Sequence, residues 1–157
     1  MMIMKPMINI VAEPIGQTYI DLLELAAARC ASFSLVWREQ FRFEQSALQL
    51  ADLLKPFLLS EVRTDEWLGT KLFGHQAIVR QYRVTDDAID ILCSVDGLYA
   101  WLEPGYPEDL AFYSSGNIGW LASISHEREA WFLDESLSLD EIYGHVPGIE
   151  IKKYKEE

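Results

Sequence analysis

One histidine and three carboxylates are the residues best placed for acid–base chemistry in this chain. Glu108 and Asp109 follow Pro107 at the start of one apolar segment, and His126 and Glu127 follow the end of the next. If these segments pair as a simple antiparallel hairpin, both groups lie at its open end. Carboxylates beside a histidine raise its pKa and let it carry protons. The structural alternative is that Asp109 accepts hydrogen bonds from a turn, which His126 helps to hold in place.

Nucleophilic and metal chemistry have less support. Ser125 directly precedes His126, so on a strand their side chains would point to opposite faces, and the chain has no Gly-x-Ser-x-Gly motif. A metal site could use His126 with Glu127, Glu129 and Asp134, but no His-x-x-x-His or His-Glu-x-x-His spacing is present. The glycines are too sparse for a phosphate-binding loop. We therefore predict neither a metal nor a cofactor.

The acidic residues are concentrated in one half of the chain. The sequence has 25 acidic and 13 basic side chains, and between Arg83 and Lys152 the only basic residue is Arg128, against 14 acids. Such a surface repels nucleic acid and attracts basic proteins. Tyrosine and tryptophan within this half could form binding hot spots, or they could be core residues beneath an ordinary solvated surface. The predicted binding residues are Tyr99, Trp101, Glu103, Tyr106, Glu129, Asp134 and Glu135.

The elements that must position these residues belong to an α+β fold. Half of the 157 residues are apolar, which suits a single domain over residues 1–157, with 152–157 as a frayed tail. Runs of helix and strand are grouped, which indicates a mostly antiparallel sheet with two or three packed helices. The predicted helices are 18–30, 46–55, 85–93 and a short one beginning at 138. The predicted strands are 33–43 (one strand or a bent pair), 57–62, 76–84, 110–114, 118–124 and 131–133.

Three local predictions carry particular weight. Thr18, Thr85 and Ser138 are each placed to cap a helix. Residues 85–102 fit either a short helix, a turn and an extended segment 98–102, or a hairpin around Asp96-Gly97; we favour the first. In the strand 118–124, period-two spacing puts alternate residues on one face. These residues are Ile118, Trp120, Ala122 and Ile124.

The cellular context is expected to be the cytoplasm. Cys30 and Cys93 are the only cysteines, too few for a disulfide framework, and are expected to be buried, reduced thiols. The apolar N-terminal residues are interrupted by Pro6 and Pro14 and do not form a signal peptide. No apolar run approaches the ~20 residues of a membrane span.

Residues 98–133 resemble a pattern found in small uncharacterised bacterial proteins, some of which resemble immunity proteins of toxin systems. The pattern has Pro-Glu-Asp before one strand, here residues 107–109, and His-Glu after the next, here residues 126–127. The resemblance implies a cytoplasmic bacterial protein that binds another protein. It supplies no catalytic residues.

Three functions are therefore considered. The favoured one is a non-enzymatic binding or inhibitor protein, immunity-like, that presents its acidic surface to a basic protein partner and binds neither nucleic acid nor membrane. The second is a small hydrolase-like enzyme using Glu108, Asp109, His126 and Glu127. The third is a structural homodimer, in which an exposed strand or the loop around Trp67 makes the contact.

Overall fold

Eight strands form one antiparallel sheet in the part of the chain that the computed structural model describes, residues 8–153. Every neighbouring pair is antiparallel, so the predicted α+β class is confirmed. From one edge to the other, the order is β10 (Ile151–Lys153), β1 (Ile8–Ile10), β9 (Glu129–Phe132), β8 (Ile118–Ile124), β7 (Glu108–Ser114), β2 (Ser32–Arg38), β6 (Ala77–Arg83) and β3 (Leu58–Thr64).

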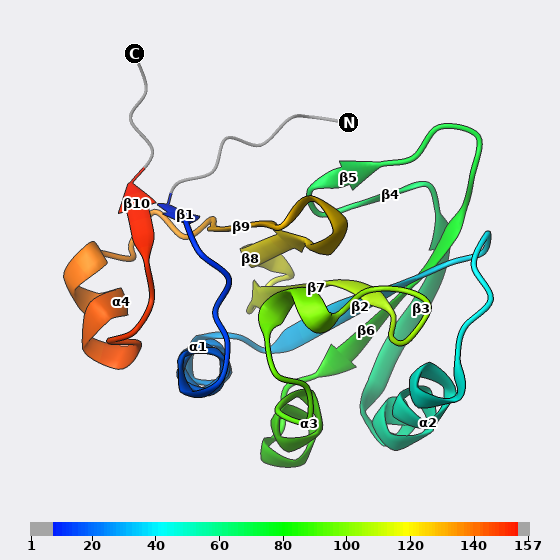
Figure 1. The fold of residues 1–157 in the computed structure, drawn as a ribbon, viewed down its shortest axis with the longest axis horizontal. Helices are drawn as coiled ribbons and strands as arrows, with labels where there is room; N and C mark the ends of the chain where they lie inside the picture. The colour runs from blue at the N-terminus through cyan, green and yellow to red at the C-terminus, as the bar shows by residue number, and fades with distance from the viewer. Residues whose placement is uncertain (1–7, 154–157) are drawn as a thin grey trace.

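A row of helices lies along one side of this sheet (Figure 1). In spatial order it contains α4 (Leu139–His145), α1 (Gln17–Arg29), α3 (Asp86–Leu92) and α2 (Gln45–Leu54). The apolar stripe of α1, including Leu22 and Leu23, packs in the main core with Phe33 of β2 and Phe112 of β7. These four side chains are fully buried, as the spacing of apolar residues in both helix and strand requires.

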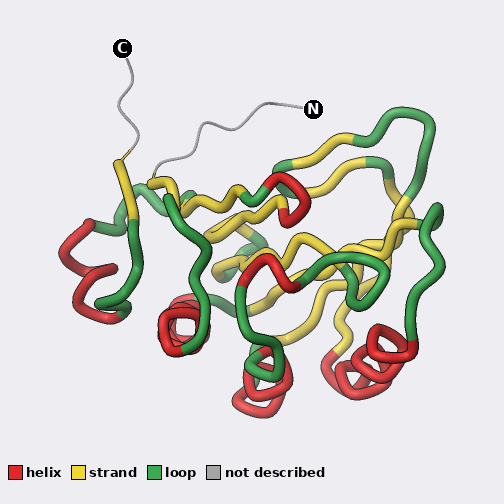
Figure 2. The backbone as a smooth tube through the Cα atoms, viewed as in Figure 1, coloured by secondary structure: helices red, strands yellow, loops and turns green. Residues whose placement is uncertain are grey.

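The short hairpin of β4 (Glu66–Trp67) and β5 (Thr70–Lys71) extends from the helix-free side of the sheet (Figure 2). It places Trp67 in a second apolar cluster with Val36 and Ala77. Strand β2 is therefore buried on both faces, by the helices on one side and by Trp67 on the other.

Two of the three predicted helix caps are present. The Thr85 hydroxyl accepts a hydrogen bond from the Ala88 amide, and the Ser138 hydroxyl accepts one from the Glu141 amide. Thr18 instead lies inside α1, whose N-cap is Gly16.

The prediction that residues 98–102 are extended is wrong for residues 98–100. Residues Leu98–Ala100 form a 3-10 turn, η2. Long-range bonds hold this turn: the Leu98 amide donates to the Pro14 carbonyl, and the Tyr99 amide donates to the Glu13 carboxylate. These partners lie more than 80 residues away, so local spacing does not reveal them.

The prediction that Ile118, Trp120, Ala122 and Ile124 share one face of strand 118–124 is also wrong. Trp120 packs in the main core, whereas Ala122 and Ile124 belong to a separate cluster with Trp131. The cause is an irregularity in the β7–β8 ladder. Phe112 lies opposite Leu121 but Tyr113 lies opposite Gly119, so Trp120 is an extra residue that shifts the alternation.

At the C-terminus, Lys152 and Lys153 lie in β10 and pair with β1, so they are not frayed. The rest of the predicted tail, 154–157, and the N-terminal residues 1–7 lie outside the described residues. None of the helices within 8–153 is long and apolar enough to cross a membrane.

Candidate functional site

The predicted convergence of a histidine and two carboxylates occurs at the open end of the β7–β8 hairpin. Glu108 and Asp109 begin β7, and His126 lies in η3 (Ser125–Glu127), the 3-10 turn that follows β8. One potential ligand atom from each of the three lies within 4.8 Å of the others. Glu127 is exposed in the same turn. We call Glu108, Asp109 and His126, together with Arg38 described below, the buried acid cluster.

A backbone irregularity brings the two adjacent carboxylates together. In a regular strand, neighbouring side chains point to opposite faces. The β2–β7 ladder skips here, because Ser34 pairs with Ala111 but Val36 pairs with Glu108. Asp109 lies in this bulge with a φ of 58°, in the left-handed region that Asp tolerates better than most residues. Both carboxylates can therefore belong to one cluster, although they are consecutive in sequence.

Asp109 connects three segments of the chain. It is 1% exposed; its Oδ1 accepts a hydrogen bond from the Ser125 amide at 2.9 Å, and its Oδ2 accepts one from the Trp67 indole at 3.0 Å. Burial raises the pKa of Asp109, while these two donors act in the opposite direction. Asp109 thus holds β7, η3 and the β4–β5 hairpin together. Its bond to the Ser125 amide of the turn corresponds to the structural role proposed from sequence, whereas its bond to Trp67 was not predicted.

Glu108 is fully buried beside a cation. The Nε of Arg38 lies 2.5 Å from its Oε1, and the Nδ1 of His126 lies 3.6 Å from its Oε2. Burial, the neighbouring Glu103 side chain and the charge of Asp109 raise the pKa of Glu108 to about 10, against the opposing effect of Arg38. Burial therefore favours the uncharged form of the Glu108 carboxyl group, and Arg38 favours the charged form.

His126 connects this buried acid to the surface. Its side chain is 46% exposed, whereas that of Glu108 is 1% exposed. An imidazole placed between a buried carboxyl group and water can exchange protons with both. The arrangement therefore permits proton transfer at Glu108.

The same atoms are poorly available to a metal ion. Arg38 already contacts one oxygen of Glu108, and both oxygens of Asp109 accept hydrogen bonds. A divalent cation would have to displace or tolerate the guanidinium, which repels it. Asp134, considered from sequence as a ligand with His126, instead accepts hydrogen bonds from the amide and hydroxyl of Ser136.

The aromatic residues predicted to bind a partner are mostly buried. Tyr99 is 6% exposed and Trp101 is 0% exposed. The Trp101 indole donates to the Tyr19 hydroxyl at 2.9 Å, Tyr106 packs against Trp101, and the Arg128 guanidinium lies over the Tyr99 ring. The placement of Tyr99 and Trp101 on a binding surface is therefore corrected, because both rings fill the main core.

The predicted acidic binding residues occupy different parts of the surface. Glu103 helps to raise the pKa of Glu108 and so lies beside the buried acid cluster. Glu129 is exposed at the start of β9, and Glu135 is exposed between β9 and α4. Burial and then the charge of Asp134 raise the pKa of the Cys30 thiol to about 12, which places Asp134 near the end of α1.

Arg38 and Trp67 are functional-site residues that sequence reasoning did not assign to the cluster. Trp67 was expected only in a loop that makes a dimer contact. One signal was available for Arg38: a buried carboxylate needs a cation or a proton, and Arg38 directly follows the apolar residues Leu35-Val36-Trp37. No local signal connects Trp67 with Asp109, 42 residues away.

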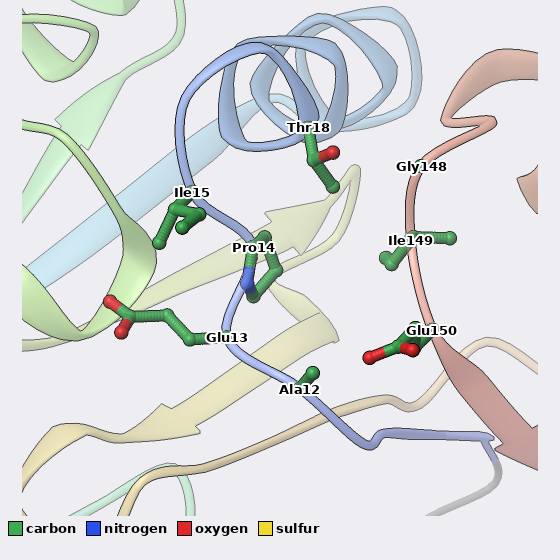
Figure 3. Close-up of a pocket in the computed structure, with 8 residues that line it drawn as sticks. All are labelled: Ala12, Glu13, Pro14, Ile15, Thr18, Gly148, Ile149 and Glu150. Carbon is green, nitrogen blue, oxygen red and sulfur yellow. The ribbon is translucent and has the colours of Figure 1, made fainter.

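A separate pocket lies where the chain leaves β1 (Figure 3). Its lining combines residues 12–15, Thr18 and residues 148–150. The Glu13 side chain points away from the enclosed space, and its oxygens accept hydrogen bonds from Arg128 and from the Tyr99 amide. The remaining lining residues offer no group suited to acid–base or nucleophilic chemistry other than Glu150 and the Thr18 hydroxyl.

Comparison with known proteins adds no further assignment to either site: no family model, no curated protein and no solved structure matches this chain.

Proposed function

We propose that this protein is a non-enzymatic cytoplasmic binding or inhibitor protein that docks a basic protein partner. The docking surface is the outer side of α1, α3 and α4, three helices that lie side by side in Figure 1. We call their seven carboxylates the acidic helical face. Its members are Asp21, Glu24, Asp86, Asp87, Asp90, Asp140 and Glu141.

The charge of this face is the observation that carries the proposal. Arg29 is the only arginine or lysine in the three helices, and its guanidinium pairs with Glu141. Burial, followed by the charges of Asp90 and Glu24, raises the pKa of the Cys93 thiol between them, so the carboxylates of α3 and α1 act on one site. A dense field of one sign accelerates encounter with a partner of opposite charge.

Neighbouring residues extend the acidic helical face and give it an aromatic contact. Asp134 and Glu135 lie in the connection that enters α4. Tyr143 of α4 is 41% exposed, and exposed tyrosine is favoured at the centre of protein interfaces. Tyr143 replaces Tyr99 and Trp101 as the aromatic residue available to a partner.

Affinity capture tests the proposal. Two baits are compared, the wild-type protein and a Glu24→Gln/Asp90→Asn variant. The matched control is Glu44→Gln/Glu150→Gln. All four carboxylates are exposed, but Glu44 and Glu150 lie outside the acidic helical face. We expect a basic protein that the wild type and the control retain and the variant loses at moderate salt. Neutralising two such charges should weaken binding roughly fivefold at low salt. Equal capture by all three baits, or a partner without a basic surface, contradicts the proposal.

A small hydrolase-like enzyme is the second candidate, and His126 is the observation that favours it. Its exposed ring lies 3.6 Å from the buried Glu108 and could transfer a proton between this acid and a substrate. Asp109 does not fit the four-residue catalytic set predicted from sequence, because both of its oxygens already accept structural hydrogen bonds. A hydrolytic activity that is lost in His126→Ala, while the fold remains intact, would favour the enzyme.

A further inference from the structure

The geometry points to β3 as a homodimer interface, in which the edge strands of two copies pair antiparallel around Val62. The inference concerns a different surface from the acidic helical face and does not depend on the proposed function. In such a dimer, the eight-stranded sheets of the two copies join through β3 into one continuous sheet. The third function considered from the sequence, a homodimer through an exposed strand, thereby gains a specific strand and register.

Strand β3 is an uncovered edge within the described residues. It lies at the end of the sheet and pairs with β6 on one side, and six of its seven residues are exposed. Along its other side, alternate backbone N–H and C=O groups face outward and can pair with another strand. Natural edges are usually short or protected by lysine or proline. The opposite edge, β10, is three residues long and contains Lys152 and Lys153, whereas β3 has seven residues and neither type.

The charges on β3 are complementary to those of a second copy. When two antiparallel strands are centred on Val62, Glu61 lies opposite the second copy's Arg63, and Arg63 lies opposite the second copy's Glu61. Glu61 already faces Arg80 of β6 at 3.3 Å, and Arg63 binds Glu39 at 2.7 and 2.9 Å. The pairing would therefore continue an existing alternation of positive and negative charge across the interface. A register centred on Glu61 would instead place two glutamates opposite each other, which is unfavourable.

The other face of the same register is apolar. Val36, Val79 and Val62 lie opposite one another across β2, β6 and β3, and Val62, the last in this row, is 54% exposed. In the dimer the row continues directly into the second copy's valines. Pairing of short strands alone gives a small interface. On the opposite, helix-covered side of the sheet, exposed leucines from α2 and the start of β3 offer additional apolar area, namely Leu48, Leu53, Leu58 and Leu59.

The distribution of charge favours this edge over other surfaces as a self-contact. Residues 1–83, which include β3, β6 and α2, carry nine basic and nine acidic side chains. The acidic excess lies in the part of the chain that forms α3, β7, β8, β9 and α4. Two copies with a formal charge of -12 each can therefore meet at β3 without bringing their acidic halves together.

Charge reversal tests the register in a way that a folding defect cannot imitate. Sedimentation equilibrium is expected to give the wild type twice the 18.0 kDa mass of one chain at high protein concentration. Glu61→Arg and Arg63→Glu each create two like-charge pairs and should each weaken self-association at least about tenfold. An equimolar mixture of the two variants restores both opposite-charge pairs, so it should form a heterodimer about as readily as the wild type forms its homodimer. Lys153→Glu on the opposite edge is the matched control and should leave association unchanged.

A disulfide provides a second test of the same register. Opposed residues in an antiparallel pair have Cα atoms about 4.5–5.5 Å apart, within the reach of a disulfide. In a Cys30→Ser/Cys93→Ser background, Val62→Cys should cross-link under mild oxidation. Ser60→Cys should not, because its two copies would lie roughly 13 Å apart. A wild type that stays monomeric, a dimer that tolerates both charge reversals, a mixture that does not associate, or cross-linking by Ser60→Cys in preference to Val62→Cys would each overturn the inference.

Discussion

Replacement of Asp109 by alanine should strongly destabilise the protein. The substitution leaves two buried donors without acceptors, the Ser125 amide and the Trp67 indole. Each unsatisfied donor costs about 1–3 kcal/mol. Alanine also tolerates the φ of 58° less well than aspartate, which adds about 1 kcal/mol. Loss of the buried carboxylate relieves its own desolvation, the main cause of its raised pKa, and offsets part of this sum. We expect a net loss of about 2–4 kcal/mol.

Urea denaturation, followed by tryptophan fluorescence and far-UV circular dichroism, measures this loss. Asp109→Asn is the graded control, because asparagine tolerates the left-handed conformation but offers one acceptor, so it should lose about half as much. A double-mutant cycle with Trp67→Phe isolates the indole bond, and we expect a coupling above about 0.5 kcal/mol. If Asp109→Ala unfolds within about 0.5 kcal/mol of the wild type, or if the cycle shows no coupling, the structural role assigned to Asp109 is incorrect.

Three further perturbations test other parts of the structure. The pKa of Glu108 rises from 4.5 in the unfolded chain to about 10 in the fold, so its contribution to the free energy of unfolding should fall as the pH rises between these values. Urea titrations at several pH values measure this dependence. The Glu108→Gln variant stays neutral and should lose it. Thr85→Ala removes the acceptor of the Ala88 amide and should lower the free energy of unfolding by about 1 kcal/mol, measured by the same titration, and an unchanged midpoint would contradict the cap. Gly97→Ala should lower the midpoint of thermal unfolding, because the added Cβ would lie 2.7 Å from a Glu13 oxygen and 3.1 Å from the Pro14 carbonyl oxygen. A midpoint equal to that of the wild type would show that these neighbouring groups move apart without cost.

The sequence was most informative where local patterns decide the structure. The turn between two apolar runs predicted the β7–β8 hairpin, and the hairpin in turn predicted that Glu108, Asp109 and His126 would meet at its open end. The caps at Thr85 and Ser138 follow from side chains that bond to amides three residues away. In each case the interaction involves neighbours in sequence or the simplest possible pairing.

The remaining features depend on long-range contacts. The bulge at Asp109 lies in the β2–β7 ladder, and period-two spacing contains no sign of it. Trp67 reaches Asp109 only because the β4–β5 hairpin lies on the helix-free side of the sheet. Tyr99 and Trp101 are buried because η2 is bonded to residues near the N-terminus, so an aromatic residue in an acidic stretch was an ambiguous signal.

The salt dependence of partner binding tests the proposed function most directly. Calorimetric titrations of a captured partner are performed at increasing salt with the wild type, Glu24→Gln/Asp90→Asn and Glu44→Gln/Glu150→Gln. If the acidic helical face makes the contact, affinity falls steeply with salt for the wild type and the control, and less steeply for Glu24→Gln/Asp90→Asn, because two charges are missing. An affinity that is independent of salt, or a slope that is the same for all three proteins, would contradict the account.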